Sequence, residues 1–134
     1  MNTKLIGWIL RIGIAGEFIG HGLLAIGGKA DWIKWIGQLM GTNPELSATL
    51  LWWIGAFDVV VALIVLVRPI PAILLWAAFW GFWTALVRPL VGAGWLDFVE
   101  RSANWAAPLA LLLMAGWPKT VREWLGMKAK NGGM

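Results

Sequence analysis

The sequence predicts an all-α fold, an integral membrane four-helix bundle, and three observations lead to this class. First, 60% of the 134 residues are hydrophobic and only 13% are charged, whereas soluble domains are roughly half apolar and about a quarter charged. Second, apolar stretches recur at about the 20 residues that a spanning helix needs. Third, turns containing glycine or proline separate these stretches. Residues 1–134 are therefore interpreted as a single membrane domain.

Each predicted span begins or ends at a recognisable signal. Asn43 and Pro44 are typical of a helix start, with a capping side chain followed by proline in the first turn. Arg88 precedes Pro89, and a residue before proline resists the α conformation, so the third span is expected to end before it. Pro108 predicts a kink within the fourth. The spans are expected at about 5–26, 45–67, 70–87 and 97–117.

Two shorter segments complete the predicted organisation. Residues 32–40 follow Asp31, a typical helix cap, and carry apolar side chains at helical spacing. This stretch is too short to cross a bilayer, so it is predicted to be an interfacial amphipathic helix after the first span. Residues 118–134 form a basic C-terminal tail, which opens on the capping-box pattern Thr120-x-x-Glu123.

The composition excludes several kinds of chemistry. The chain has no cysteine, which removes disulfides, thiolate metal sites and a dithiol-driven quinone reductase. His21 is the one histidine, so a single chain cannot offer two imidazoles to a haem, and no metal site is predicted. The net charge of +4 is assigned to contact with anionic membrane lipid rather than with nucleic acid.

Basic residues also predict the orientation of the chain. In this topology one side holds both termini and the middle loop, with Lys4, Arg68, Lys119, Arg122, Lys128 and Lys130. The other side holds Lys29 and Lys34, with Arg88 at a span end. Since lysine and arginine favour the inside, both termini are expected in the cytoplasm, and the location is expected to be the bacterial inner membrane.

Ionisable side chains inside the spans are the main functional signal. Each costs roughly 2.5–3.5 kcal/mol at the bilayer centre, so these groups should face inward and pair. Their positions are Arg11, Glu17, His21, Asp58, Arg88, Glu100 and Arg101. At ~1.5 Å rise per residue, most of them share a layer in the outer half of the membrane with Thr84 and Asn104. Arg11 and Asp58 fall deeper and are predicted to form a structural pair.

A polar pocket between the first, third and fourth spans follows from this shared layer. Glu17 and His21 lie four residues apart, on one helix face, and are the predicted catalytic, proton-exchanging groups. Aromatic walls and a few directed polar groups suit a flat amphipathic molecule. The predicted binding residues are Trp80, Trp83, Thr84, Arg88, Glu100, Arg101, Asn104 and Trp105. The alternative is that the same network only holds the helices together.

Several short motifs resemble the DoxX-like family of small four-helix bacterial membrane proteins. They are Arg11-x-Gly13, Phe18-x-x-His21-Gly22, the region of Trp53, Gly55 and Asp58, the run from Thr84 to Leu90, and Asn104-Trp105-x-x-Pro108-Leu109. The family's name derives from a subunit of a thiosulfate:quinone oxidoreductase, so the resemblance implies a redox-associated subunit that binds a quinone or another lipophile. Relatives commonly carry lysine three residues after the histidine-glycine pair, where this chain has Ala25.

A second, local resemblance concerns the first span alone. The run from Ala15 to Gly20 is similar to the first helix of small multidrug-resistance exporters, which implies a proton-coupled exporter using Glu17. Three arginines within the spans would repel cationic drugs, and the likeness ends with that helix. The hypotheses kept are therefore a quinone-binding redox subunit, a structural or assembly subunit without its own site, and such an exporter. Membrane lipid is the expected partner, with a second copy of the chain or a larger membrane complex.

Overall fold

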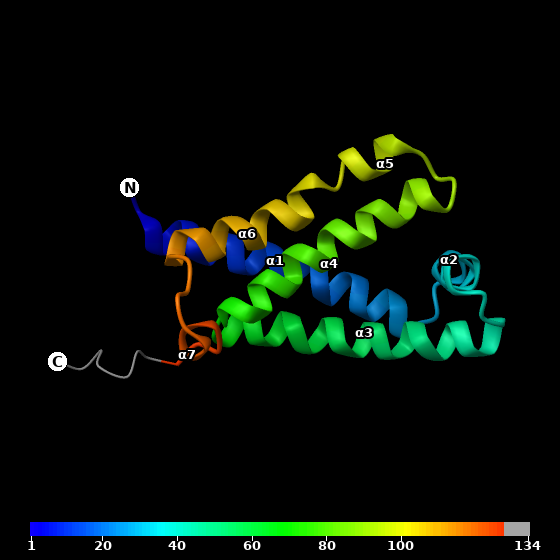
Figure 1. The fold of residues 1–134 in the computed structure, drawn as a ribbon, viewed down its shortest axis with the longest axis horizontal. Coiled ribbons are helices and arrows are strands. Elements are labelled where there is room, and N and C mark those ends of the chain that lie inside the picture. The colour runs from blue at the N-terminus through cyan, green and yellow to red at the C-terminus, as the bar shows by residue number, and fades with distance from the viewer. Residues whose placement is uncertain (128–134) are drawn as a thin grey trace.

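The computed structural model describes residues 1–127, and that part of the chain is helical without a strand. Figure 1 shows the order of its helices. They are α1 (Thr3–Ile26), α2 (Ala30–Met40), α3 (Pro44–Val67), α4 (Pro71–Leu90), α5 (Trp95–Val99), α6 (Ser102–Ala115) and α7 (Val121–Trp124). The end of the predicted basic tail, 128–134, lies outside the described residues. The predicted all-α class is confirmed.

Three helices, α1, α3 and α4, are long and apolar enough to cross a membrane. The predicted start of α3 is confirmed, because the Asn43 side chain accepts a hydrogen bond from the Leu46 amide at 2.8 Å and Pro44 opens the helix. The third predicted span continues further than expected, through Pro89. Proline removes only one backbone bond so near a helix end, and the Val91 amide still closes the last turn onto the Val87 carbonyl at 3.0 Å.

The fourth predicted span is interrupted at Glu100 and Arg101, where α5 ends and α6 begins. Side chains here take the carbonyl groups that a continuous helix would use. Arg101 donates to the Asp97 carbonyl at 3.0 Å, and the Ser102 hydroxyl donates to the Val99 carbonyl at 2.6 Å. This leaves α6 with 14 residues, so it is not among the helices long enough to span. An uninterrupted fourth helix at 97–117 is therefore not what the chain forms.

The long helices run together, and α2 lies crosswise at one end of them, where Figure 1 views it end-on. The start of α1 and the short helix α7 lie at the opposite end. The core is shared by α1, α3, α4 and α6 and consists of Ile14, Ala15, Phe18, Val61, Ala62, Val65, Leu74, Ala77, Leu111 and Leu112. Placement of α2 at a membrane surface stays a prediction.

Helices α1 and α3 cross closely, and two glycines permit the approach. A Cβ atom on Gly55 would lie 2.6 Å from the Gly22 carbonyl oxygen, and one on Gly22 would lie 2.8 Å from the Gly55 carbonyl oxygen. Small residues at such positions let helix backbones approach closely in membranes. This crossing fixes where the adjacent polar residues of α1 and α3 meet.

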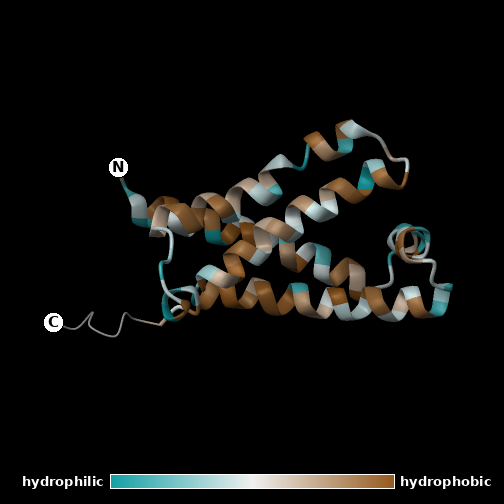
Figure 2. Cartoon of the chain, in the orientation of Figure 1, coloured by the Kyte–Doolittle hydropathy of each residue, from teal (hydrophilic) through white to brown (hydrophobic). Residues whose placement is uncertain are grey.

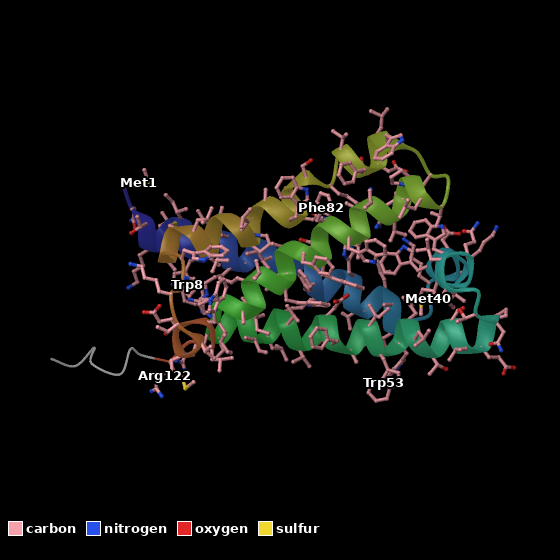
Figure 3. All side chains as sticks on the ribbon, in the orientation of Figure 1. Met1, Trp8, Met40, Trp53, Phe82 and Arg122 are labelled. Carbon is pink, nitrogen blue, oxygen red and sulfur yellow. The ribbon has the colours of Figure 1, made fainter. Side chains whose placement is uncertain are left out.

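The outer faces of the long helices are apolar. Figure 2 shows hydrophobic residues along their lengths, with hydrophilic ones mostly near the ends and the connecting turns. In Figure 3, Trp53 points away from the bundle, and its side chain is 64% exposed. Exposed apolar patches of this extent mark a surface that contacts lipid or another protein, which agrees with the length and composition of the three apolar helices.

Candidate functional site

A cavity of about 210 Å³ lies beside α2, at the end of the bundle away from α7. Helices α1, α2, α3 and α4 all contribute to its walls. The lining residues are His21, Ala25, Trp32, Trp35, Ile36, Leu39, Met40, Leu51, Ile54, Asp58, Trp80, Trp83, Thr84, Val87 and Arg88. Most of this surface is apolar or aromatic, with a few polar groups among it, which is the usual make-up of a small-molecule site.

The aromatic side of the cavity is held by ring contacts. Trp80 stacks on Trp76, with ring centres 5.4 Å apart and planes 13° from parallel. Trp76 in turn meets the ring of Phe57 edge-on at 5.6 Å. On the other side, the His21 imidazole meets Trp32 edge-on at 5.5 Å. These contacts hold the rings of Trp80 and His21 in the cavity wall.

Arg88 is the cation of the cavity, and only 6% of the residue is exposed. It sits in the last turn of α4, where one of its terminal nitrogens donates a hydrogen bond to the Thr84 carbonyl. Its guanidinium lies over the ring of Trp35, 5.2 Å from the ring centre. Within residues 1–127 the buried Nε atom has no hydrogen-bond partner. Contacts with α4 and α2 thus position the Arg88 side chain and leave its Nε–H group without an acceptor among the described residues.

Asp58 supplies the acid of the cavity and is 4% exposed. It lies one turn after Gly55, on the buried face of α3 that continues with Val61 and Val65. Its Oδ1 atom is buried and has no hydrogen-bond partner among the described residues. A buried acceptor without a partner is costly, so the packing of α3 alone does not account for an aspartate at this position.

The predicted pair of Arg11 and Asp58 does not form. The Arg11 Nε atom donates to the Val65 carbonyl at 3.0 Å, a terminal nitrogen donates to the Leu66 carbonyl, and the guanidinium lies 3.8 Å from the ring centre of Trp8. The physical reason is that the last carbonyls of a helix lack amide partners. The amide four residues after Val65 belongs to Pro69, which has no N–H.

The predicted binding residues fall into two separate places. Four of them line the cavity, namely Trp80, Trp83, Thr84 and Arg88, whereas the remaining ones, Glu100, Arg101, Asn104 and Trp105, do not. Arg101 pairs instead with its neighbour Glu100 at 2.6 Å, near the surface. The α6 backbone at Asn104 packs against α4, since a Cβ atom on Gly81 would lie 2.5 Å from the Asn104 carbonyl oxygen. The ring of Trp105 meets Phe82 edge-on.

Glu17 lies next to the cavity rather than in its wall. The residue is partly buried on α1, one turn before His21, and it interacts electrostatically with Asp58. His21 follows on the same face of α1, and its ring contacts Trp32. The two predicted proton-exchanging residues are therefore near each other, but only His21 reaches the cavity.

Sequence reasoning missed the contribution of α2. This helix was expected on the surface, yet Trp32, Trp35, Ile36, Leu39 and Met40 all face the cavity. The signal was present, because these are the apolar positions of the amphipathic pattern, and a helix with one apolar stripe must cover something with it. The surface available to the stripe of α2 was the end of the bundle that carries the predicted layer of polar residues.

No protein-family model, curated protein or solved structure matches this chain. The site is therefore interpreted from its own chemistry. It offers one imidazole, one carboxylate, one guanidinium and one hydroxyl among indole rings. Aromatic walls with a few polar groups are typical of sites for small amphipathic molecules, and an imidazole is a side chain that can exchange a proton near neutral pH.

Proposed function

We propose that this chain is a DoxX-like multi-pass protein of the bacterial inner membrane whose cavity binds the headgroup of a quinone or a comparable lipophile. In this proposal it serves a redox-associated membrane complex. The observation that carries it is the amphipathic cavity itself, which four tryptophans from α2 and α4 line together with buried Asp58 and Arg88.

The size of the cavity favours a single ring. Its volume of about 210 Å³ is below the range of roughly 300–1,000 Å³ common for sites that hold drug-sized ligands. A substituted benzoquinone ring is a flat molecule of this smaller class. Its apolar tail would extend along the exposed apolar faces of the helices, into lipid.

The roles of the polar groups follow from their chemistry. Arg88 donates hydrogen bonds and orients a ring oxygen, and His21 exchanges a proton with that oxygen or with a second one. Glu17, one turn along α1, passes protons to His21. In the accessory-subunit alternative these groups serve only structure. The exporter alternative has no support in the cavity, because Glu17 does not line it.

The test is a melting shift in detergent or nanodiscs with a soluble benzoquinone analogue. A ligand at a hundredfold excess over Kd stabilises the folded state by about 2.7 kcal/mol, so wild type should melt at a clearly higher temperature. His21→Asn should remain folded and lose part of this shift. Trp53→Phe, on the outer face of α3, is the matched control and should keep it.

Two results would contradict the proposal. A wild-type protein whose melting temperature no benzoquinone changes does not bind this class in its cavity, and the accessory-subunit reading then holds. A shift of the same size in wild type and in His21→Asn would retain the binding site but remove His21 from it.

A further inference from the structure

The cavity contains two buried polar atoms of opposite kind, neither of which has a partner. Asp58 Oδ1 belongs to a carboxylate, which only accepts hydrogen bonds when ionised. Arg88 Nε carries an N–H, which only donates. Both residues line the same cavity, and each is more than nine-tenths buried. Within the described part of the chain neither atom has a hydrogen-bond partner.

The two groups do not satisfy each other. An Arg88 terminal nitrogen is engaged by the Thr84 carbonyl, and its guanidinium is held over Trp35. Among residues 1–127 the ion pair that forms is the one between Arg101 and Glu100, not one between Arg88 and Asp58. The helices that carry the two groups therefore place them on the walls of one cavity without pairing them.

We infer that the cavity selects a ligand that brings both a hydroxyl donor and an oxygen acceptor on one aromatic ring, which is the pattern of a phenol or hydroquinone rather than of an oxidised quinone. This inference rests on the proposed function and narrows its ligand class. A quinone offers carbonyl acceptors alone, which satisfy Arg88 and leave Asp58 without a donor. A ring hydroxyl donates to Asp58, and a second oxygen accepts from Arg88.

The surrounding wall supports a ring as the carrier of these groups. Trp80 is fixed by stacking on Trp76, and Trp35 and Trp83 complete the aromatic lining. A flat ring between indoles places its substituents at its edge, where hydrogen bonds to side chains on different helices can form together. An aliphatic alcohol would meet Asp58 but would leave the aromatic faces poorly filled.

The inference is tested with two uncharged, redox-inert probes that differ by one hydrogen-bond donor. Methyl 4-hydroxybenzoate has a phenol and an ester carbonyl, and methyl 4-methoxybenzoate has the same carbonyl with the phenol methylated. Dissociation constants are measured by titration of the protein in nanodiscs, with empty nanodiscs subtracted to remove partitioning into lipid. The loss of a hydrogen bond to a charged group corresponds to roughly ten- to a hundredfold in Kd, so wild type should prefer the phenol by that factor.

Two variants assign the preference to its residues. Asp58→Leu replaces the acceptor with an apolar side chain, so the ratio of the two dissociation constants should fall to about one. Asp58→Asn keeps the shape of the side chain and one acceptor oxygen, so its ratio should lie between those of wild type and Asp58→Leu. This variant provides the test if the leucine variant folds poorly. Arg88→Met keeps the apolar stem and removes the donor, so it should weaken both probes and leave their ratio unchanged.

Failure of this inference is distinguishable from failure of the proposed function. Equal binding of the two probes to wild type overturns the selection for a donor while the lipophile site stands. Discrimination that survives Asp58→Leu and Asp58→Asn removes Asp58 from the explanation and overturns the assignment. If neither probe nor any benzoquinone binds, the site itself is refuted together with the inference.

Discussion

Asp58 and Arg88 each carry a buried polar atom that lowers the stability of the fold, and both residues line the candidate site. A buried polar group without a partner costs about 1–3 kcal/mol, and both residues are nearly inaccessible. Arg11, which is partly buried, avoids that cost by donating to the last carbonyls of α3. Arg11 therefore helps to hold α1 against α3, whereas Asp58 and Arg88 each keep a polar atom without a partner among the described residues.

Replacing Asp58 with leucine is expected to stabilise the protein in the absence of ligand. Leucine is larger than aspartate and can extend into the cavity that Asp58 lines, and it removes the unpaired acceptor and adds apolar contacts near Leu51 and Ile54. The free energy of unfolding should therefore rise by about 1–3 kcal/mol. Thermal unfolding in detergent measures this, with Asp31→Asn on the exposed start of α2 as a control that should change little. A marked loss of stability in Asp58→Leu would show that the carboxylate has a structural partner.

Depth along a helix was a useful guide to the residues of the site, but it was incomplete. His21, Thr84 and Arg88 were grouped because they share a layer, and all three line the cavity. Asp58 was assigned to Arg11 by depth and opposite charge. That assignment failed because the competing partner was backbone, at Val65, which only the position of Pro69 reveals.

At the scale of elements, glycine determines how closely the helices approach. Gly22 and Gly55 meet at the crossing of α1 and α3, while Gly13, Gly16 and Gly20 on α1 have open space where a Cβ atom would lie. The chain thus has two kinds of helical glycine, and only one kind is required by packing. Since Asp58 follows Gly55 by one turn, this crossing also sets the position of one wall of the cavity.

Gly55→Ala should be destabilising, and Gly13→Ala should not. The new Cβ atom at Gly55 would lie 2.6 Å from a backbone oxygen, and overpacking of this kind typically costs about 1–3 kcal/mol. At Gly13 the same change removes a helix-weakening residue and should add up to about 1 kcal/mol. Unfolding by sodium dodecyl sulfate titration compares them. Equal stability of the two variants would mean that the helices do not cross at Gly55.

The elements themselves were largely predictable, and the exception has a local cause. The cap and the proline at the start of α3 indicated that boundary closely, since Asn43 and Pro44 act within one turn. The break between α5 and α6 was not predicted. Apolar content is continuous there, and only the geometry shows Arg101 and Ser102 taking the carbonyls of Asp97 and Val99.

At the scale of the whole molecule, the two ends of the bundle differ in character. One end holds the start of α1, the turn between α3 and α4, and α7, which Arg68 ties down by donating to the Gly126 carbonyl. The other end holds α2 and the cavity. A ligand would therefore enter near only one membrane face, and the orientation of the chain decides which compartment exchanges protons with it.

Labelling of single cysteines can determine this orientation, because the native chain contains none. Gln38→Cys on α2 and Lys119→Cys before α7 are both exposed positions. If both termini are cytoplasmic, an impermeant maleimide added to spheroplasts should label the first and not the second. Permeabilised cells, in which both should react, are the control. The opposite pattern would place the cavity in the inner half of the bilayer.

The interruption between α5 and α6 has a consequence within a lipid bilayer. With 14 residues, α6 measures about 21 Å along its axis, whereas α1 and α3, with 24 each, measure about 36 Å. A hydrocarbon core is about 30 Å thick. On its own α6 would fall short of that thickness, and α5, which continues its line in Figure 1, would make up the difference across the break. The break would then lie among lipid tails, which offer no hydrogen bonds, and the side chains of Arg101 and Ser102 would satisfy its carbonyls in place of water.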